Sequence, residues 1–89
     1  MSLREAVLAF LAARAPGAYA EGAVAQRVAA SGLTDAGAAG AGEELALLAS
    51  ERMGRLVGCD VNPVSKELVW FATDAGVRRW RLDGRPHVG

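Results

Sequence analysis

The side chains best suited to catalysis or metal binding are few in this chain and far apart. Its 89 residues include one histidine, His87, and one cysteine, Cys59. A structural zinc site takes about four ligands, drawn mainly from cysteine and histidine, and this pair does not supply them. The glycines Gly37, Gly40 and Gly42 lack the lysine and the preceding strand of a phosphate-binding loop. We therefore expect no enzyme activity, no bound metal and no cofactor.

Charged side chains are the next source of chemistry, and they are unevenly distributed. The net charge is zero, but residues 1–51 hold three basic residues against six acidic ones, a net charge of −3. Residues 52–89 hold seven basic residues against four acidic ones, a net charge of +3. Arginine binds phosphate through a planar fork of donors, and such contacts give an affinity that falls steeply with salt. The candidate nucleic-acid contacts in this basic half are Arg52, Arg55, Lys66, Arg78 and Arg79.

These cations also have an interpretation that involves no nucleic acid. Nearby carboxylates, among them Asp74 and Asp83, would pair with them on a solvated helix face. Trp70 and Trp80 would be able to stack on unpaired bases, but their spacing and apolar neighbours favour packing in the core. Charge and aromatic content therefore leave both interpretations open.

The basic residues flank a predicted β-hairpin. In residues 55–61 the side chains of Val57, Cys59 and Val61 alternate onto one face, and residues 67–72 are rich in β-branched and aromatic types. An Asn-Pro pair between the two runs starts a turn. We expect the runs to pair as antiparallel strands, and Cys59 to be a small buried residue on the inward face rather than a reactive thiol.

A short helix is expected directly after the hairpin. Thr73 stands at its N-cap, where the hydroxyl accepts from a backbone N–H of the first turn. Val77 and Trp80, three residues apart, would turn an apolar face back onto the hairpin. We expect Trp70, Phe71 and Trp80 to be buried against the first helix of the chain.

That first helix has clear signals at both ends. Ser2 and Glu5 form a capping box, in which each side chain bonds the backbone N–H of the other residue. The Pro16-Gly17 pair stops the helix. Tyr19 follows in a connector that would add one short strand to the edge of the hairpin, with its ring packed inward.

Two more helices are predicted in the first half of the chain. Residues 20–30 form one of them, with Gly32 as its left-handed stop. Residues 34–42 include three glycines, each of which costs about 1 kcal/mol in a helix interior, so this segment is either a frayed helix start or a loop. The next helix is predicted over residues 43–53 and is stopped by Gly54.

The predicted order is helix, short strand, helix, helix, strand, turn, strand, helix, and it resembles a winged helix-turn-helix domain over residues 2–80. Residues 70–77, WFATDAGV, are similar to the last strand and the T-x-x-G helix start of bacterial regulators of the multiple-antibiotic-resistance and PadR kinds. Residues 54–57, GRLV, are similar to the opening of the wing. The expected fold class is α+β, a winged helix-turn-helix with three helices, a small antiparallel β-hairpin (the wing) and a short C-terminal helix. Residues 1–82 would form this single domain, and residues 83–89 a C-terminal tail.

The resemblance implies DNA binding and transcription regulation without catalysis. The helix at 43–53 would be the recognition helix, which enters the major groove, and residues 62–66 would be the wing tip. The outward side chains of that helix would be Glu43, Leu47, Ser50 and Glu51. They count against this role, because carboxylates are repelled by phosphates and their one direct use, accepting from cytosine N4, is a minority contact. The alternative is a winged helix used for protein–protein interaction or self-association, with an interface that includes Glu43, Leu47 and Glu51. The expected partner is therefore double-stranded DNA, or else a protein, which includes a second copy in a homodimer.

Targeting signals are absent from the sequence pattern. No apolar run approaches the roughly 18 residues that a membrane span requires. The first ten residues carry Arg4 and Glu5 and lack the small-residue cleavage site of a secretory signal. We expect a cytoplasmic protein that does not enter a membrane.

Overall fold

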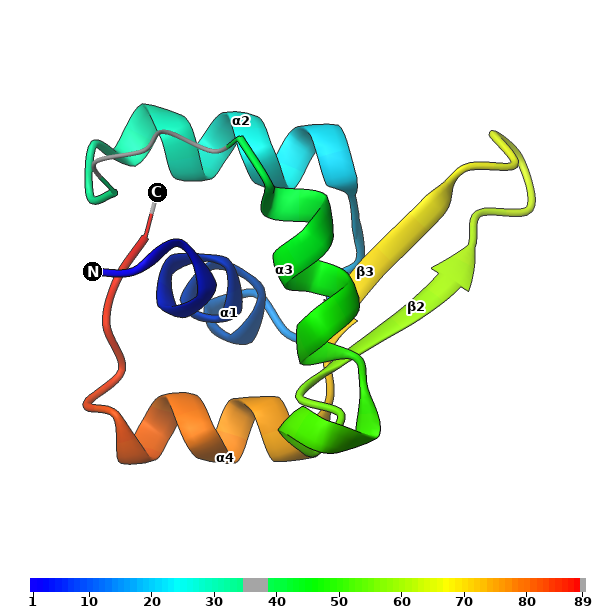
Figure 1. Cartoon of the computed structure of the whole chain (residues 1–89). Coiled ribbons are helices and arrows are strands. Elements are labelled where there is room, and N and C mark those ends of the chain that lie inside the picture. The colour runs from blue at the N-terminus through cyan, green and yellow to red at the C-terminus, as the bar shows by residue number, and fades with distance from the viewer. Residues whose placement is uncertain (35–38, 89) are drawn as a thin grey trace.

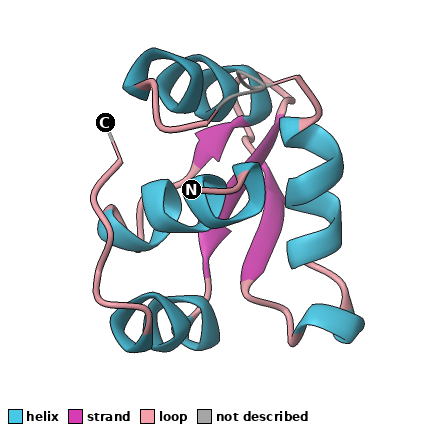
Figure 2. Ribbon diagram, turned by 60° about the vertical axis from the view of Figure 1, so that its left-hand side comes forward, coloured by secondary structure: helices cyan, strands magenta, loops and turns pink. Residues whose placement is uncertain are grey.

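The computed structural model describes residues 1–34 and 39–88, which form an α+β domain with four α-helices and a three-stranded antiparallel sheet (Figure 1). Helix α1 lies in the middle, between α2 and α4, and the strands lie behind it (Figure 2). The order of elements is the predicted one, with a 3₁₀ turn added after α3. In chain order the elements are α1 (Leu3–Ala13), β1 (Tyr19–Ala20), α2 (Glu21–Ser31), α3 (Ala41–Leu48), the 3₁₀ turn η1 (Glu51–Met53), β2 (Val57–Val61), β3 (Leu68–Ala72) and α4 (Asp74–Leu82).

Helix α1 is the centre of the core. The predicted capping box is present, because Ser2 Oγ accepts from the Glu5 N–H at 3.1 Å and Glu5 Oε1 accepts from the Ser2 N–H at 3.4 Å. Residues 6–12 are all buried, since α2, α3, α4 and β3 each pack against this helix. A helix that is apolar and covered on every side belongs in a core rather than at a surface.

The sheet has the strand order β1-β3-β2, and both pairings are antiparallel as predicted. Tyr19 in β1 pairs with Trp70, and its ring meets the ring of Phe10 edge-on, with centroids 5.3 Å apart. At the turn of the hairpin, Asn62 Oδ1 accepts from the N–H of Val64 at 2.8 Å. This is the local bond expected of an asparagine that starts a turn.

Cys59 is exposed, so the prediction that it is buried was wrong. It pairs with the buried Trp70 and therefore shares the core-side face of the sheet. Along this face of β2, Val57 is 1% exposed but Val61 is 51% exposed. The hairpin runs past the helices (Figure 1), so they cover only its beginning. Alternation predicts the face of a strand correctly but not how far a neighbouring helix reaches along it.

Phe71 departs from prediction for a different reason. Trp70 is 9% exposed and packs in the core as expected, and Trp80 is half-buried against the core. Phe71, next to Trp70 in β3, must point to the opposite face, and it is half-buried there. Its ring covers Gly58, where an added Cβ would lie 2.3 Å from the ring. Phe71 therefore stabilises the hairpin and is not part of the contact with α1.

Helix α3 both begins and ends earlier in the sequence than the predicted helix over residues 43–53. It begins at Ala41 and ends at Leu48, and η1 follows as a separate turn. Ser50 causes the break, because its backbone is extended and its hydroxyl donates to the carbonyl of Leu47 at 2.5 Å. Serine side chains compete in this way with helical backbone bonds. Residues 35–38 of the glycine-rich segment lie outside the described residues, and its conformation stays a prediction.

Helix α4 begins as predicted, with Thr73 Oγ1 accepting from the Gly76 N–H at 3.1 Å. The segment after α4 turns back toward α1 (Figure 1). Trp80 Nε1 donates to the carbonyl of Pro86 at 2.9 Å, and Nη1 of Arg14 donates to the carbonyl of Val88 at 3.1 Å. Val88 is 0% exposed. Val88 is therefore part of the core, although residues 83–87 before it are exposed or half-buried.

Candidate functional site

The outward face of α3 is the first surface to consider, because the resemblance makes α3 the recognition helix. Ala41, Leu45 and Leu48 of this helix are buried. The opposite side carries Glu43 and Ala46, both of which are exposed. One carboxylate and one methyl group therefore stand where a major-groove reader needs long hydrogen-bonding side chains.

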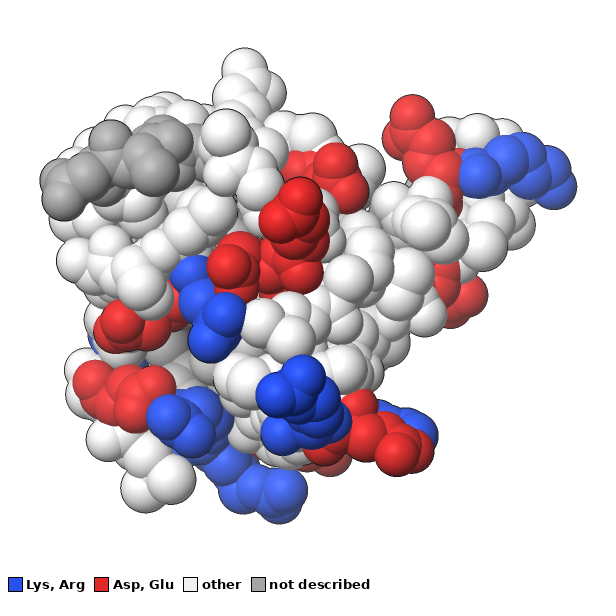
Figure 3. Space-filling model, in the orientation of Figure 1, with Lys and Arg blue, Asp and Glu red and all other residues white. Residues whose placement is uncertain are grey.

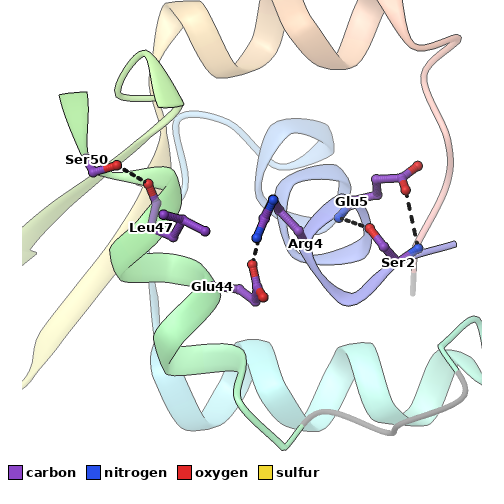
Figure 4. A network of polar contacts seen from close by, with 6 residues as sticks. All are labelled: Ser2, Arg4, Glu5, Glu44, Leu47 and Ser50. Carbon is purple, nitrogen blue, oxygen red and sulfur yellow. Dashed lines mark hydrogen bonds and ion pairs between the residues drawn. The ribbon is translucent and has the colours of Figure 1, made fainter. Parts of the chain in front are cut away.

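The flank of α3 that faces α1 holds an ion pair and Leu47. Arg4 Nε donates to Glu44 Oε2 at 2.8 Å. The side chain of Leu47 points toward the same flank (Figure 4) and is half-buried. The prediction of an outward Leu47 is therefore corrected, because its half-buried side chain lies on the flank of α3 that faces α1 and not opposite the core.

The start of α3 gathers further negative charge. Glu21, at the beginning of α2, lies against it: a Cβ added at Gly42 would be 2.3 Å from Glu21 Oε1. Glu43 and Glu44 stand in the first turn of α3 itself. Carboxylates at this end are favourable for the helix, because the unbonded N–H groups carry partial positive charge. Acidic side chains accordingly cover this part of the surface (Figure 3).

The hairpin adds exposed apolar side chains to the surface. Among the described residues, three of the six large hydrophobic side chains that are exposed belong to the hairpin: Val61 at 51%, Val64 at 90% and Leu68 at 54%. Val61 and Leu68 are direct partners across the two strands. The charged residues of the hairpin are Asp60, Lys66 and Glu67.

The predicted basic set divides into two groups. Arg52 and Arg55 lie in and just after η1, and Arg78 and Arg79 lie on α4; all four are exposed. Thr73 Oγ1 donates to the Arg55 carbonyl at 2.7 Å, which holds the start of α4 beside η1. These four arginines therefore lie at one end of the molecule, which we call the basic end.

Lys66 is not part of the basic end. It lies at the hairpin tip, beyond the five residues of β2, which span about 16 Å at 3.3 Å per residue. Two of the four arginines are also paired, Arg55 with Glu51 and Arg79 with Asp83, the latter at 3.4 Å. Glu51 thus lies at the basic end, and only Glu43 of the predicted interface residues stays on the outward face of α3.

A half-open cavity of about 190 Å³, which sequence reasoning did not find, lies between α1, η1, α4 and the C-terminal segment. Leu8, Leu48, Met53 and Trp80 are among its apolar lining residues. Glu5 at its rim has a pKa below its ordinary value, because hydrogen bonds with Ser2 favour the ionised carboxylate. That shift belongs to the helix cap, and it does not prepare Glu5 as a proton donor near neutral pH.

Within residues 1–34 and 39–88, no three or more His, Cys, Asp or Glu side chains are grouped so as to hold a metal ion. No helix in the same ranges is long and apolar enough to cross a membrane. Comparison of the chain with protein-family models, curated protein sequences and solved structures finds no significant match.

Proposed function

We propose that this chain is a winged-helix domain that acts through protein contacts, without catalysis and without reading DNA bases. The winged-helix assignment is supported by the order of elements, in which α3 is followed by a β2–β3 hairpin and a third strand, β1, pairs at the edge. Winged helices serve both nucleic-acid and protein partners, so the surface must decide between them.

The composition of α3 and the hairpin is the observation that carries the proposal. The outermost side chains of α3 are Glu43 and Ala46, and the hairpin exposes three large aliphatic side chains, those of Val61, Val64 and Leu68. A duplex presents closely spaced negative charges, and a protein gains affinity for it by placing cations against them. A protein partner, in contrast, gains from apolar side chains buried at the centre of an interface with charges at the rim.

DNA binding at the basic end is the second candidate. Arg52, Arg55, Arg78 and Arg79 are exposed there, and Figure 3 shows basic side chains near α4 and η1. Contacts of this kind would go to phosphates, which carry no sequence information. The domain would then bind duplexes of any sequence, and α3 would take no part.

A salt-titrated binding assay on generic duplex DNA separates the two. The proposal expects little affinity at about 0.1 M salt, because the outward face of α3 offers a carboxylate and no cation to the phosphates. A double variant, E43Q/E51Q, removes two negative charges and should raise any residual binding. Tight, salt-sensitive binding by the unmodified chain that is lost in an R52Q/R55Q variant would instead establish the second candidate.

The protein-contact surface is tested by comparing matched variants. Val64 at the hairpin tip is 90% exposed, and Leu82 at the end of α4 is 85% exposed. V64E should abolish a protein contact made by the hairpin, whereas L82E, which adds the same charge elsewhere, should leave it unchanged. Chemical cross-linking is carried out on the unmodified domain and, separately, on each variant. Equal cross-linking yields for V64E and L82E would contradict the proposed surface.

A further inference from the structure

The cavity between α1, η1, α4 and the C-terminal segment has no part in the proposed function. It has a volume of about 190 Å³ and a half-open mouth. Its apolar lining combines buried core residues with half-buried wall residues, which are Leu8, Ala9, Leu48, Met53, Leu56 and Trp80. Protein sites for small ligands are concave and mostly apolar in this way.

The polar groups next to this lining are already bonded. Trp80 Nε1 donates to the Pro86 carbonyl at 2.9 Å, and the Leu56 N–H donates to the Leu48 carbonyl at 2.9 Å. Among the described residues, the one buried side-chain nitrogen or oxygen without a partner is Nε1 of Trp70, which does not line the cavity. A bound water needs several polar partners, whereas an apolar ligand needs none. The lining therefore favours an apolar ligand.

The volume of the cavity sets the size of that ligand. An engineered cavity of about 150 Å³ lined by Leu, Ile and Phe binds benzene, so a volume of about 190 Å³ fits one aromatic ring with a small substituent. Trp80 and Met53 suit a ring in particular. An indole packs well against another ring, and a thioether makes favourable contacts with one.

The charges at the mouth indicate that the ligand is uncharged. Arg79 Nε lies 3.4 Å from Asp83 Oδ2, and Arg4 Nε lies 2.8 Å from Glu44 Oε2. Glu5, which also lines the mouth, is held in the cap of α1. A charged ligand would have to compete with these partners, and a charge that is buried without a partner is costly.

The same mouth favours a small molecule over the side chain of a partner protein. Its exposed charged side chains are those of Arg4, Glu5, Arg79 and Asp83. A protein seated over the mouth would take these charges out of water, a cost that the attraction within ion pairs often does not repay. A molecule of one ring lies below the charged side chains and leaves them hydrated.

We propose that this cavity binds an uncharged molecule with a single aromatic ring. The ring would pack against Trp80 and Met53 above the buried Leu8, and a polar substituent on it would face the hydrated mouth. This site is separate from the hairpin surface of the proposed function, so either can fail without the other.

Titration with benzyl alcohol tests the site, and the indole N–H signals in ¹H–¹⁵N spectra give the readout. Trp80 and Trp70 are the chain's two tryptophans, and only Trp80 lines the cavity. Benzyl alcohol should shift the Trp80 signal saturably and leave the Trp70 signal in place. Benzoate and benzylammonium, which carry opposite charges on the same ring, should bind at least about tenfold more weakly. The absence of a saturable Trp80 shift, or equal or tighter binding of a charged probe, would overturn the proposal.

Variants that fill the cavity show whether the Trp80 shift arises there. A9L enlarges a side chain of the lining and should abolish binding. A13L makes the same change at an exposed position of α1 outside the lining and should retain it. M53W fills the cavity from its wall and decides the outcome if A9L does not fold, and an unchanged Trp70 signal shows that the core of a variant is folded. Binding that survives in the folded filling variants would place the ligand elsewhere and overturn the site.

Discussion

Phe10 and Phe71 are the same residue type, but their environments should make them contribute differently to the free energy of unfolding. Phe10 is 1% exposed and is enclosed by the ring of Tyr19 and by the Arg14 guanidinium, whose Cζ lies 4.0 Å from the ring centroid. Phe71 covers Gly58 on the outer face of the sheet. We expect Phe10→Ala to cost about 3–5 kcal/mol of unfolding free energy and Phe71→Ala clearly less. Urea denaturation of the two variants measures this, and equal losses would place Phe71 in the core after all.

The cap of α1 makes a prediction about pH. Hydrogen bonds with Ser2 lower the pKa of Glu5, so the ionised carboxylate stabilises the folded chain at neutral pH. That stabilisation is lost as the pH falls through the folded-state pKa. Ser2→Ala should cost about 1 kcal/mol near pH 7 through loss of the cap, and its deficit should shrink in acid. Thermal midpoints of both proteins from pH 7 to pH 3 measure the difference, and a constant deficit would contradict the role of Glu5.

Two helical glycines give a matched test at the scale of elements. An added Cβ at Gly76 in α4 would lie 2.0 Å from the Leu56 carbonyl oxygen, whereas one at Gly22 in α2 would meet nothing within 4 Å. Gly22→Ala should stabilise the domain by up to about 1 kcal/mol, since alanine is the better helix former. Gly76→Ala should destabilise it by about 1–3 kcal/mol, because α4 must move away from the backbone of Leu56, the residue just before β2. The denaturant midpoints of the two variants measure these stability changes. If Gly76→Ala left the midpoint unchanged, α4 would be only loosely held.

The C-terminal segment contributes to the stability of the whole molecule. Val88 is 0% exposed, and the Val64 side chain is of the same type but 90% exposed. Val88→Ala should cost about 1–3 kcal/mol because a fully buried aliphatic side chain is truncated. Val64→Ala should stay within about 0.5 kcal/mol, as surface changes usually do. Calorimetric unfolding of the two variants provides the comparison, and matching transitions would mean that residues 85–88 do not hold the core together.

At the scale of the whole molecule, charge is separated more than the linear sequence indicates. The acidic residues of α3 lie near Glu21 of α2, and the basic end forms where η1 meets α4. Lys66, between these groups in sequence, is carried away by the hairpin. The five predicted cations therefore do not form one surface, and a duplex lying along the basic end would not reach all of them.

Local features of this protein followed from the sequence alone. The caps at Ser2 and Thr73, the antiparallel hairpin and the left-handed stop at Gly32 involve residues only a few positions apart. Their bonds form from short-range geometry, so the residue types and spacing are sufficient to predict them. The order of elements, and with it the α+β class, followed from the same signals.

Tertiary structure alone decided how far each element is covered. Cys59 and Val57 have the same alternation, yet only Val57 lies under a helix, because the extent of coverage depends on segments far away in sequence. Leu47 turned toward α1 and Val88 entered the core for the same reason. Burial is a property of packing between distant segments, and a period of 2 or 3.6 residues gives only the direction of a side chain.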